Sequence, residues 1–311
     1  MITVFGSVNV DMVMRVAALP EPGETVLCPE YLLVPGGKGA NQALAAARAG
    51  AKVRMAGRVG RDTFADVALS LLKEDGVDLG GIETSDRPTC CAAVWVDESG
   101  ENAIVVASGA NLDASAEQLA AAMPGAGDWL VLQMEVPHDE NWAAIRHARA
   151  HGAKVMLSVA PAAPVPEAVL AGVDILLVNA VEGRSVAQAI GLASDAPGDI
   201  VTALAQRFGM TCVMTLGSQG ALAMAPDEGF RVPPLPAQVV DTTAAGDAFA
   251  GILAGALDAG QSLQDALRRA SAGAGLACQT VGAQPSLPHA AAIEAALPTL
   301  PPVEALKDTA R

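Results

Sequence analysis

Aromatic residues are scarce in this chain. Only nine of its 311 residues are aromatic, namely three Trp, one Tyr and five Phe, whereas 64 are alanine. A core with so few rings has to be filled closely by small aliphatic side chains, which suits helices lying near a sheet. About half of the residues are apolar, which is enough for one large domain or two smaller ones.

Basic residues are also few. The chain has 19 Lys and Arg against 34 Asp and Glu, which gives a formal net charge of −15. Binding to nucleic acid or to an anionic lipid surface needs clustered cations, and the sequence has no run of them. We therefore expect neither a nucleic-acid partner nor a membrane partner, while a local basic pocket for a small anion is compatible with the net charge.

The sequence also shows no disulfide pattern, no signal-peptide pattern and no long apolar run. The five cysteines are odd in number and form no CxxC pair, which is typical of free thiols in a reducing compartment. The first residues lack the basic and apolar regions of a signal peptide, and no uncharged apolar stretch reaches the roughly 18 residues of a membrane span. The sequence thus predicts a cytoplasmic globular protein.

Short β-branched runs alternate with Ala- and Leu-rich stretches of helical length, which is typical of an α/β protein with a mostly parallel sheet. The predicted strands are residues 2–5, 52–56, 129–134, 154–158, 174–178 and 211–216. The predicted helices include residues 41–48, 62–74 and 263–277, in which apolar residues recur at helical spacing. We expect a single doubly wound α/β domain over residues 1–311, with helices flanking the sheet.

Two segments interrupt this alternation with hairpin-like patterns. Residues 11–35 predict a strand, a turn at 20–23 and a second strand over 25–34, and residues 90–107 predict two strands joined at 97–100. These hairpins predict a small antiparallel sheet outside the main one. Because such a sheet must bury one face on something, we expect it to be a lid or a dimer surface.

Two polar motifs follow the first predicted strand and the first hairpin. Asn9 and Asp11 point the same way in an extended chain, so they can donate to and accept from vicinal hydroxyls; an Asx turn is the alternative. The glycine-rich segment 35–42 leads into a helix, where Gly37, free N–H groups and the charge of Lys38 favour a polar or anionic ligand. A glycine turn before a helix explains that segment equally well.

The most informative motif is segment 239–251, in which an apolar run passes through hydroxyl and small residues into an Ala- and Leu-rich helix. The N–H groups of Ala244, Ala245 and Gly246 at this helix start are predicted to form an anion hole. Asp247 would lie in the first helical turn and act as a general base for an attacking hydroxyl. The alternative is an ordinary N-terminal helix charge.

Smaller polar signals follow later strands. Glu135 comes directly after strand 129–134. Asn179 and Glu182 follow strand 174–178, and as an amide and a carboxylate three residues apart they can hold a hydrated magnesium ion near phosphates. A glycine turn suited to nucleotide contacts follows strand 211–216 and contains Thr215, Gly217 and Gly220. Each is more often a cap or a turn when taken alone, but all fall at the same end of successive strands, where open α/β sheets bind ligands.

The two glycine-containing motifs together resemble the PfkB family of carbohydrate kinases. Segment 35–43, and segment 241–247 with Phe249 and Gly251, are similar to the two signatures of that family in their order and separation. The resemblance extends from Gly6 to about Pro288. It implies a doubly wound sheet with a small β-sheet lid and the ATP-dependent phosphorylation of a sugar hydroxyl. Within the family, the chain is most similar to members that convert D-ribose to D-ribose 5-phosphate.

The resemblance also implies roles for individual residues. Asp247 would be the base, beside an anion hole formed by Ala244, Ala245 and Gly246. The sugar would be held by Asn9, Asp11, Gly37, Lys38, Asn41, Glu135 and Asp247. The nucleotide would be bound by Asn179, Glu182, Thr215, Gly217 and Gly220, with Glu182 near Mg²⁺ through water. An activating K⁺ would be bound by Asp241, Thr243, Ala277, Thr280, Gly282 and Ser286. The lid would also form the contact of a homodimer.

Two alternatives stay open. The chain resembles family members for other acceptors as well, such as fructose, a deoxy sugar acid or a nucleoside. A nucleoside kinase would be expected to stack the base on aromatic rings, for which the chain offers mainly Trp95, and a sugar-acid kinase would need an extra cation by the carboxylate. A non-catalytic sugar-binding relative is the second alternative, and the intact Asp247 with its anion hole argues against it.

Overall fold

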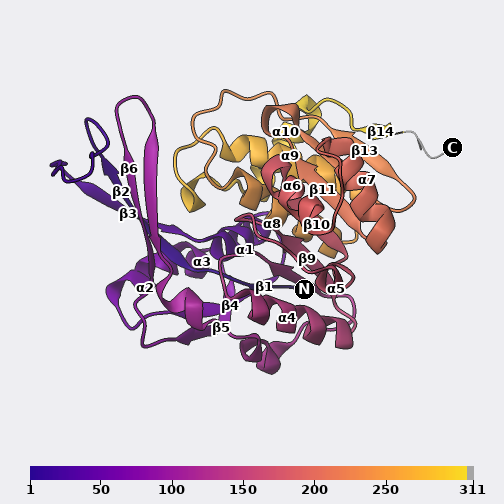
Figure 1. The fold of residues 1–311 in the computed structure, drawn as a ribbon, viewed down its shortest axis with the longest axis horizontal. Helices are drawn as coiled ribbons and strands as arrows, with labels where there is room; N and C mark the ends of the chain where they lie inside the picture. The colour runs from indigo at the N-terminus through magenta and orange to yellow at the C-terminus, as the bar shows by residue number, and fades with distance from the viewer. Residues whose placement is uncertain (307–311) are drawn as a thin grey trace.

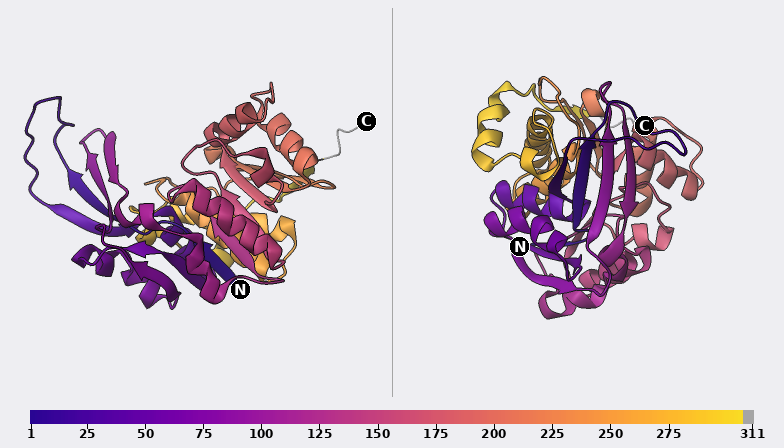
Figure 2. Two further views of the ribbon diagram at one scale, coloured as in Figure 1. Left: turned by 60° about the horizontal axis from the view of Figure 1, so that its bottom comes forward. Right: turned by 90° about the vertical axis from the view of Figure 1, so that its left-hand side faces the viewer.

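The computed structural model describes residues 1–306, which form a large sheet covered by helices and a small sheet that stands away from it (Figure 1 and Figure 2). In the large sheet, ten strands follow the order β14-β13-β12-β11-β10-β9-β8-β1-β4-β5. The parallel strands are β1 (Ile2–Phe5), β4 (Val53–Val59), β5 (Asp78–Thr84), β8 (Trp129–Leu132), β9 (Lys154–Ser158), β10 (Ile175–Asn179) and β11 (Thr211–Thr215). The antiparallel edge consists of β12 (Ala221–Met224), β13 (Gly229–Val232) and β14 (Glu304–Leu306). The predicted doubly wound, mostly parallel sheet is confirmed.

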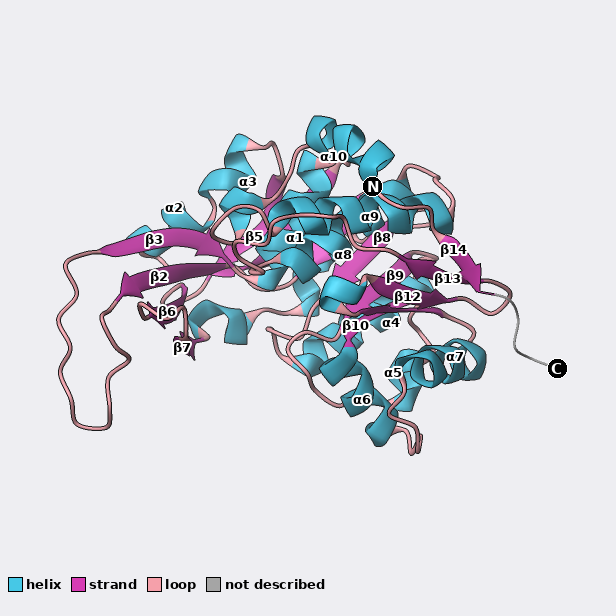
Figure 3. Cartoon of the chain, turned by 90° about the horizontal axis from the view of Figure 1, so that it is seen from above, coloured by secondary structure: helices cyan, strands magenta, loops and turns pink. Residues whose placement is uncertain are grey.

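Helices cover both faces of this sheet, and each face has its own apolar core (Figure 3). One face carries α1 (Lys38–Arg48), α2 (Thr63–Ala68), α3 (Ser70–Glu74), α8 (Ala245–Asp258), α9 (Leu263–Ala277) and α10 (Ala290–Ala296). The other carries η2 (Ala116–Ala122), α4 (His138–Ala150), α5 (Glu167–Leu170), α6 (Ala180–Ala189) and α7 (Pro197–Phe208). No helix within residues 1–306 is long and apolar enough to cross a membrane.

The many alanines pack α8 closely against its neighbours. Ala248, Ala250 and Ala254 on this helix are fully buried. Where α8 packs on α1, a Cβ added to Gly251 would collide with the carbonyl oxygen of Gln42 and lie 2.9 Å from the nitrogen of Ala46. The small residues of α8 therefore bring its first turn, which carries Asp247, next to α1.

Two helices differ from their predicted bounds for local reasons. Helix α1 begins at Lys38, three residues earlier than predicted, because Gly37 adopts φ 91° as its N-cap and its carbonyl accepts a 2.8 Å bond from the N–H of Asn41. The single helix predicted over 62–74 is broken at Leu69 into α2 and α3. There the hydroxyl of Ser70 donates to the carbonyl of Val67 at 2.7 Å, a back-bond that bends helices.

The small sheet has the strand order β3-β2-β6-β7, formed by β2 (Asn9–Arg15), β3 (Tyr31–Gly36), β6 (Cys90–Val96) and β7 (Asn102–Ala107). Each hairpin is antiparallel as predicted, but the two hairpins join through a parallel pairing of β2 with β6. Both strands leave the same edge of the large sheet, after β1 and β5, so they run in the same direction. Strand β3 begins at residue 31 and not 25, because Pro29 cannot donate to a ladder.

Candidate functional site

Glu135 connects β8, the end of β1 and the start of α1. Its Oε2 accepts hydrogen bonds from the Ser7 hydroxyl at 2.6 Å and from the N–H of Lys38 at 3.0 Å. Ser7 Oγ in turn accepts a 3.1 Å bond from the N–H of Gly39. One carboxylate oxygen thus fixes the glycine-rich helix start to β1. The other oxygen has no hydrogen-bond partner among residues 1–306, so it is available to a ligand.

Asn9 is held by a residue that the sequence analysis missed. Asn111, in η1 (Gly109–Asp113), donates from Nδ2 to Asn9 Oδ1 at 2.7 Å and accepts from the N–H of Val8 at 3.0 Å. Both asparagines are buried. A signal was present in the sequence, because Asn111 follows the second predicted hairpin as Asn41 follows the first.

A cavity of 490 Å³ lies between the small sheet and the carboxyl end of β8. Its lining includes Asn9, Glu135 and Asn111, with His138 at the start of α4. This volume is within the range of small-molecule sites. Another cavity, of 260 Å³, is lined by Met1, the ends of α1 and α8, and Lys52, and it contains none of the predicted site residues.

Asp247 lies in the first turn of α8 and is 6% exposed. Its Oδ2 accepts a 3.0 Å bond from Asn41 Nδ2, and its Oδ1 accepts a 2.9 Å bond from Gln42 Nε2. Burial raises the pKa of Asp247, while the charge of Lys38 and these two amide bonds oppose the rise. In return, Asp247 is the main cause of the raised pKa of Lys38. The buried carboxylate of Asp247 and the half-buried ammonium of Lys38 thus stabilise each other's charge.

The predicted anion hole has an unusual backbone. Ala244, the N-cap of α8, adopts φ 58°, and among residues 1–306 it is the one non-glycine residue with positive φ. The N–H of Ala245 donates to the carbonyl of Thr242 at 3.2 Å. Within the described chain the N–H groups of Ala244 and Gly246 have no hydrogen-bond partner. Two of the three predicted donors are thus free to bind an anion, and the third is engaged locally.

Asn179 and Glu182 form a capping box at the start of α6. The Asn179 side chain accepts from the N–H groups of Val181 and Glu182, while Glu182 accepts from the Asn179 N–H at 2.7 Å and from its Nδ2 at 2.8 Å. Burial raises the pKa of Glu182, against the hydrogen bond from Asn179 and the charge of Lys38. The cap and the predicted position near phosphates are compatible, because carboxylate oxygens can accept more than one bond.

The predicted nucleotide loop contains two glycines with different roles. Thr215 ends β11, and Gly217 and Gly220 have φ values of 56° and 81° on either side of η3 (Gly217–Gln219). A Cβ on Gly220 would collide with the carbonyl oxygen of Val232, whereas a Cβ on Gly217 would meet nothing within 4 Å. Gly220 is therefore explained by the fold, and Gly217 leaves open space for a ligand.

Asp241 joins two loops that are far apart in the sequence. Its Oδ1 accepts from the N–H and the hydroxyl of Thr243 at 2.9 and 2.6 Å, and its Oδ2 accepts from the N–H of Gly282 at 2.8 Å. Burial would raise the pKa of Asp241, but these bonds lower it below its ordinary value. Nearby turns contain the other predicted potassium residues, Ala277, Thr280 and Ser286.

Arg48 fixes the loop that carries Ser286. From the end of α1, its guanidinium donates to the carbonyls of Gln284 and Leu287 at 2.8 and 2.9 Å, and it pairs with Asp75 at 2.8 Å. The loop is thereby tied to the same helix that begins with Lys38. Glu135 follows β8, and Asn179 and Thr215 end β10 and β11, so these three predicted residues lie at the carboxyl end of the parallel strands.

The sequence profile of the pfkB family of carbohydrate kinases matches residues 1–290. The chain belongs to this family. It is 36% identical over 303 residues to the bifunctional ribokinase/ribose-5-phosphate isomerase A of Fructilactobacillus sanfranciscensis, covering 94% of this chain but 55% of that protein. It is 34% identical over 291 residues to the ribokinase of Haemophilus influenzae, covering 92% and 95% of the two chains. Arabidopsis thaliana ribokinase, solved in complex with ribose and ATP, has a TM-score of 0.85 and 30% identity over 95% of this chain and 98% of that one.

Asp11 of this PfkB kinase lies in an acidic environment. Burial and the charge of Glu135 raise its pKa from 3.8 to about 6, with a further contribution from Asp247 and opposition from Lys38. A Cβ on Gly36 of β3 would lie 2.5 Å from Asp11 Oδ2, so the strand pairing leaves this carboxyl little room. Above pH 6 the protein therefore carries a destabilising charge at this position.

We expect the substitution Asp11→Asn to stabilise the free protein at neutral pH. The carboxyl binds its proton more tightly in the folded state, so its contribution to the free energy of unfolding declines as the pH rises from about 4 to 6. An amide carries no such charge. The free energy of unfolding of the variant should therefore exceed that of the parent protein by about 3 kcal/mol above pH 7, and this difference should vanish below about pH 4. Urea unfolding of both proteins across this range measures the difference, and a difference that does not change with pH would contradict the assignment.

Proposed function

We propose that this kinase transfers the terminal phosphoryl group of ATP to the 5-hydroxyl of D-ribose. The sugar oxygen forms a bond to phosphorus, the bond to the ADP oxygen breaks, and the hydroxyl proton passes to Asp247. The observation that carries the proposal is the buried Asp247 carboxylate, held by Asn41 and Gln42 at the start of α8. The ribokinase names of its relatives, one of them solved with ribose and ATP, support the choice of both substrates.

The remaining residues supply orientation and charge. We assign the sugar hydroxyls to the side chains around Glu135, namely Asn9, Asp11, Lys38 and Asn41, with Gly37 at the helix start. The Oδ1 of Asn41 is buried without a partner in the described chain, as expected for an atom that accepts a bond from the sugar. Phosphoryl transfer depends mainly on positioning and on charge stabilisation, which Lys38 and the N–H groups of Ala244 and Gly246 would provide.

We propose that Mg²⁺ is held mainly by the substrate phosphates and water, and not by a full set of protein ligands. No group of three His, Cys, Asp or Glu side chains within residues 1–306 could hold a metal ion. Mg²⁺ usually keeps several waters and binds one or two carboxylates plus substrate phosphates, so we place Glu182 near it through water. When bound, the ion would neutralise charge on the phosphates. Gly217 and Thr215 would contact the nucleotide from the neighbouring strand end.

The cavity lining favours a neutral sugar over the alternative acceptors. None of the described residues that line it is Phe, Tyr or Trp, on which a nucleobase would stack, and the lining adds to Lys38 no further Lys or Arg for the carboxylate of a sugar acid. Asn9, Asn111 and Glu135 instead offer donors and acceptors for hydroxyl groups.

A coupled assay of ADP release over a panel of acceptors tests the proposed function. D-Ribose should give the highest kcat/KM, above fructose, 2-keto-3-deoxy sugar acids and nucleosides. A higher kcat/KM for another sugar would identify that sugar, and not ribose, as the acceptor. The absence of turnover with every acceptor would indicate a non-catalytic sugar-binding protein.

We further propose that K⁺ binds beside Asp241 and activates the enzyme. The loops of Asp241 and Gly282, joined by a hydrogen bond and clamped by Arg48, carry carbonyl and hydroxyl oxygens near α8. Activity in buffer containing K⁺ should exceed that in buffer containing only Na⁺ by several fold. Equal rates in the two buffers would rule this site out.

The small sheet is proposed as a lid over the sugar and as the contact of a homodimer. Its strands expose Tyr31, Leu32, Ile104, Val105 and Val106, each more than half exposed. Successive side chains point to opposite faces, so the face with Val106 borders the cavity and the other face offers apolar side chains to a second copy. Closure would exclude water, which otherwise accepts the phosphoryl group. Sedimentation equilibrium at micromolar concentration should give twice the chain mass, and a monomer would contradict this assembly.

The five free cysteines suit a reducing compartment, and we propose the cytoplasm.

A further inference from the structure

A chain of buried amides leads from Asp247 to α4. Gln42 Nε2 donates to Asp247 Oδ1 at 2.9 Å, and Gln133 Nε2 donates to Gln42 Oε1 at 2.9 Å. Asn141, on α4, donates from Nδ2 to the backbone carbonyl of Gln133 at 2.6 Å. Gln42, Gln133 and Asn141 are 0% exposed. None of these three residues lines the cavity, and the proposed mechanism uses none of them except Gln42 as a donor.

The hydrogen bonds give this chain a single direction. An ionised carboxylate can only accept, so it requires the NH₂ group of Gln42 to face it. The oxygen of Gln42 then faces Gln133 and requires a donor from that amide. If Gln42 were reversed, its oxygen would face the Asp247 carboxylate and its NH₂ group would face that of Gln133. The orientations of the two amides are therefore coupled, and the NH₂ group of Gln133 favours the orientation of Gln42 in which its own NH₂ group faces Asp247.

Two glycines leave room for this arrangement. A Cβ added to Gly6, at the end of β1, would collide with Gln133 Oε1, which is buried without a hydrogen-bond partner in the described chain. A Cβ on Gly251 would collide with the backbone carbonyl oxygen of Gln42. A buried polar atom without a hydrogen-bond partner costs free energy. The fold nevertheless leaves Gln133 Oε1 unpaired, while the NH₂ group of the same side chain donates to Gln42.

We propose that Gln42 and Gln133 are positioning residues that act in series on Asp247. Gln133 fixes the orientation of Gln42, and Gln42 with Asn41 fixes the plane of the Asp247 carboxylate and keeps it ionised for the incoming hydroxyl. Each carboxylate oxygen has two lone pairs, so the two amides leave acceptor capacity for the substrate. This inference rests on the proposed function of Asp247 as the base.

Other charged groups around Asp247 also influence its pKa and so the pH dependence of kcat. Lys38 of α1 favours the ionised carboxylate, while Glu135 after β8, Asp11 of β2 and Glu182 of α6 oppose it. Removing an amide that bonds the charged form raises the pKa of Asp247. The acid limb of the kcat profile would therefore move to higher pH.

The substitution Gln42→Met tests the first step. It removes the donor to Asp247 in a side chain of similar volume, and we expect the acid limb of kcat to rise by about one to two pH units. On the acid limb kcat should fall by about tenfold for each pH unit of the shift and recover at higher pH, while KM for the sugar should change by less than about threefold.

Gln133→Met tests the second step. It leaves Gln42 able to donate but removes the partner that orients it, so the limb should shift in the same direction by a smaller amount. The double variant Gln42→Met/Gln133→Met should show the shift of Gln42→Met alone, since Gln133 acts only through Gln42. Additive shifts would mean that the two residues act independently and would overturn the series.

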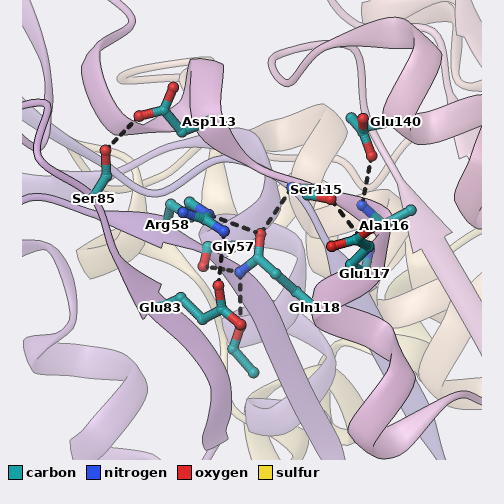
Figure 4. Close-up of polar contacts among 11 residues, drawn as sticks. Gly57, Arg58, Glu83, Ser85, Asp113, Ser115, Ala116, Glu117, Gln118 and Glu140 are labelled. Atoms are coloured by element: carbon teal, nitrogen blue, oxygen red, sulfur yellow. Dashed lines mark hydrogen bonds and ion pairs between the residues drawn. The ribbon is translucent and has the colours of Figure 1, made fainter.

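Gln118 provides a matched control (Figure 4). This buried glutamine of η2 donates from Nε2 to the carbonyls of Gly57 and Gly81 at 2.7 and 3.2 Å and accepts from the N–H of Ser115. Gln118→Met should lower stability without moving the pH profile. If Gln42→Met behaves in the same way, its role is only structural and the proposal fails.

A titration that needs no turnover separates this inference from the proposed function. The ¹³C carboxyl resonance of Asp247, assigned by its absence in Asp247→Asn, should titrate at higher pH in Gln42→Met than in the parent protein. An unchanged titration overturns the proposal whatever the acceptor of the enzyme is. A shifted titration in a protein that phosphorylates no acceptor would support the hydrogen-bond chain and contradict the proposed reaction.

Discussion

Asp247→Asn should lower kcat by about 10²- to 10⁴-fold, which is the range that a positioned general base contributes. The amide cannot accept the hydroxyl proton, and its NH₂ group would face either Asn41 or Gln42, which both donate toward this side chain. Sugar affinity should change by less than about tenfold, because the other proposed sugar ligands remain. Steady-state assays measure the first effect, and calorimetric titration with D-ribose measures the second. Near-normal turnover would remove Asp247 as the base.

Asp265→Asn is the control for the alternative that Asp247 is an ordinary helix-end charge. Asp265 occupies the first turn of α9, where the N–H of Asp265 donates to the N-cap Ser262. An exposed charge at such a position contributes about 0.3–1 kcal/mol to stability. We expect Asp265→Asn to lower the free energy of unfolding slightly and to leave kcat unchanged. A comparable loss of activity in both variants would point to a general effect of acidic residues at helix starts.

Gly251→Ala should destabilise the protein and slow phosphoryl transfer together. The added Cβ would collide with backbone atoms of α1, which cannot move aside without moving that helix. Overpacking of this kind costs about 1–3 kcal/mol. Because α1 carries both donors to Asp247, a displaced helix would also misplace the base. We therefore expect kcat to fall by about 10²-fold.

Gly255→Ala, one turn further along α8, should have the opposite effect on stability. Its added Cβ would have the Cβ of Ala51 as its nearest neighbour, at 3.5 Å, which is ordinary van der Waals contact. The substitution therefore gains the roughly 0.5–1 kcal/mol by which alanine exceeds glycine inside a helix. Thermal unfolding and kcat of both variants test the pair. If Gly251→Ala also stabilises the protein without loss of activity, α8 does not depend on close contact with α1 at this position.

Six strands of the large sheet and helix α9 could be predicted because their patterns are local, whereas β5, β12, β13 and β14 were not predicted. Helix α9 agrees with the apolar periodicity of residues 263–277, and β1 matches its predicted run. The differences arose where side chains and geometry override such patterns. The hydroxyl of Ser70 bonds a carbonyl and bends the chain where one predicted helix is divided into α2 and α3. The parallel pairing of β2 with β6 follows from where both strands leave the large sheet.

The candidate site could be predicted only for residues that belong to motifs. Asn41 and Asp247 stand in the two family signatures, and the structure brings them within hydrogen-bond distance although they are 206 positions apart. Asn111 and Gln133 belong to neither signature. Their roles depend on partners 102 and 91 positions away, and a single sequence does not reveal such pairs.

The sequence by itself determined the class of core, the alternation of strands and helices and the resemblance to carbohydrate kinases. Its shortage of aromatic residues and excess of alanine already required close helix packing, since small side chains fill a core only when the backbones approach one another. The tertiary structure alone decided which buried polar groups meet. A buried donor or acceptor must find a partner wherever packing places one, and for Asp247 those partners are Asn41 and Gln42, 206 and 205 positions earlier in the chain.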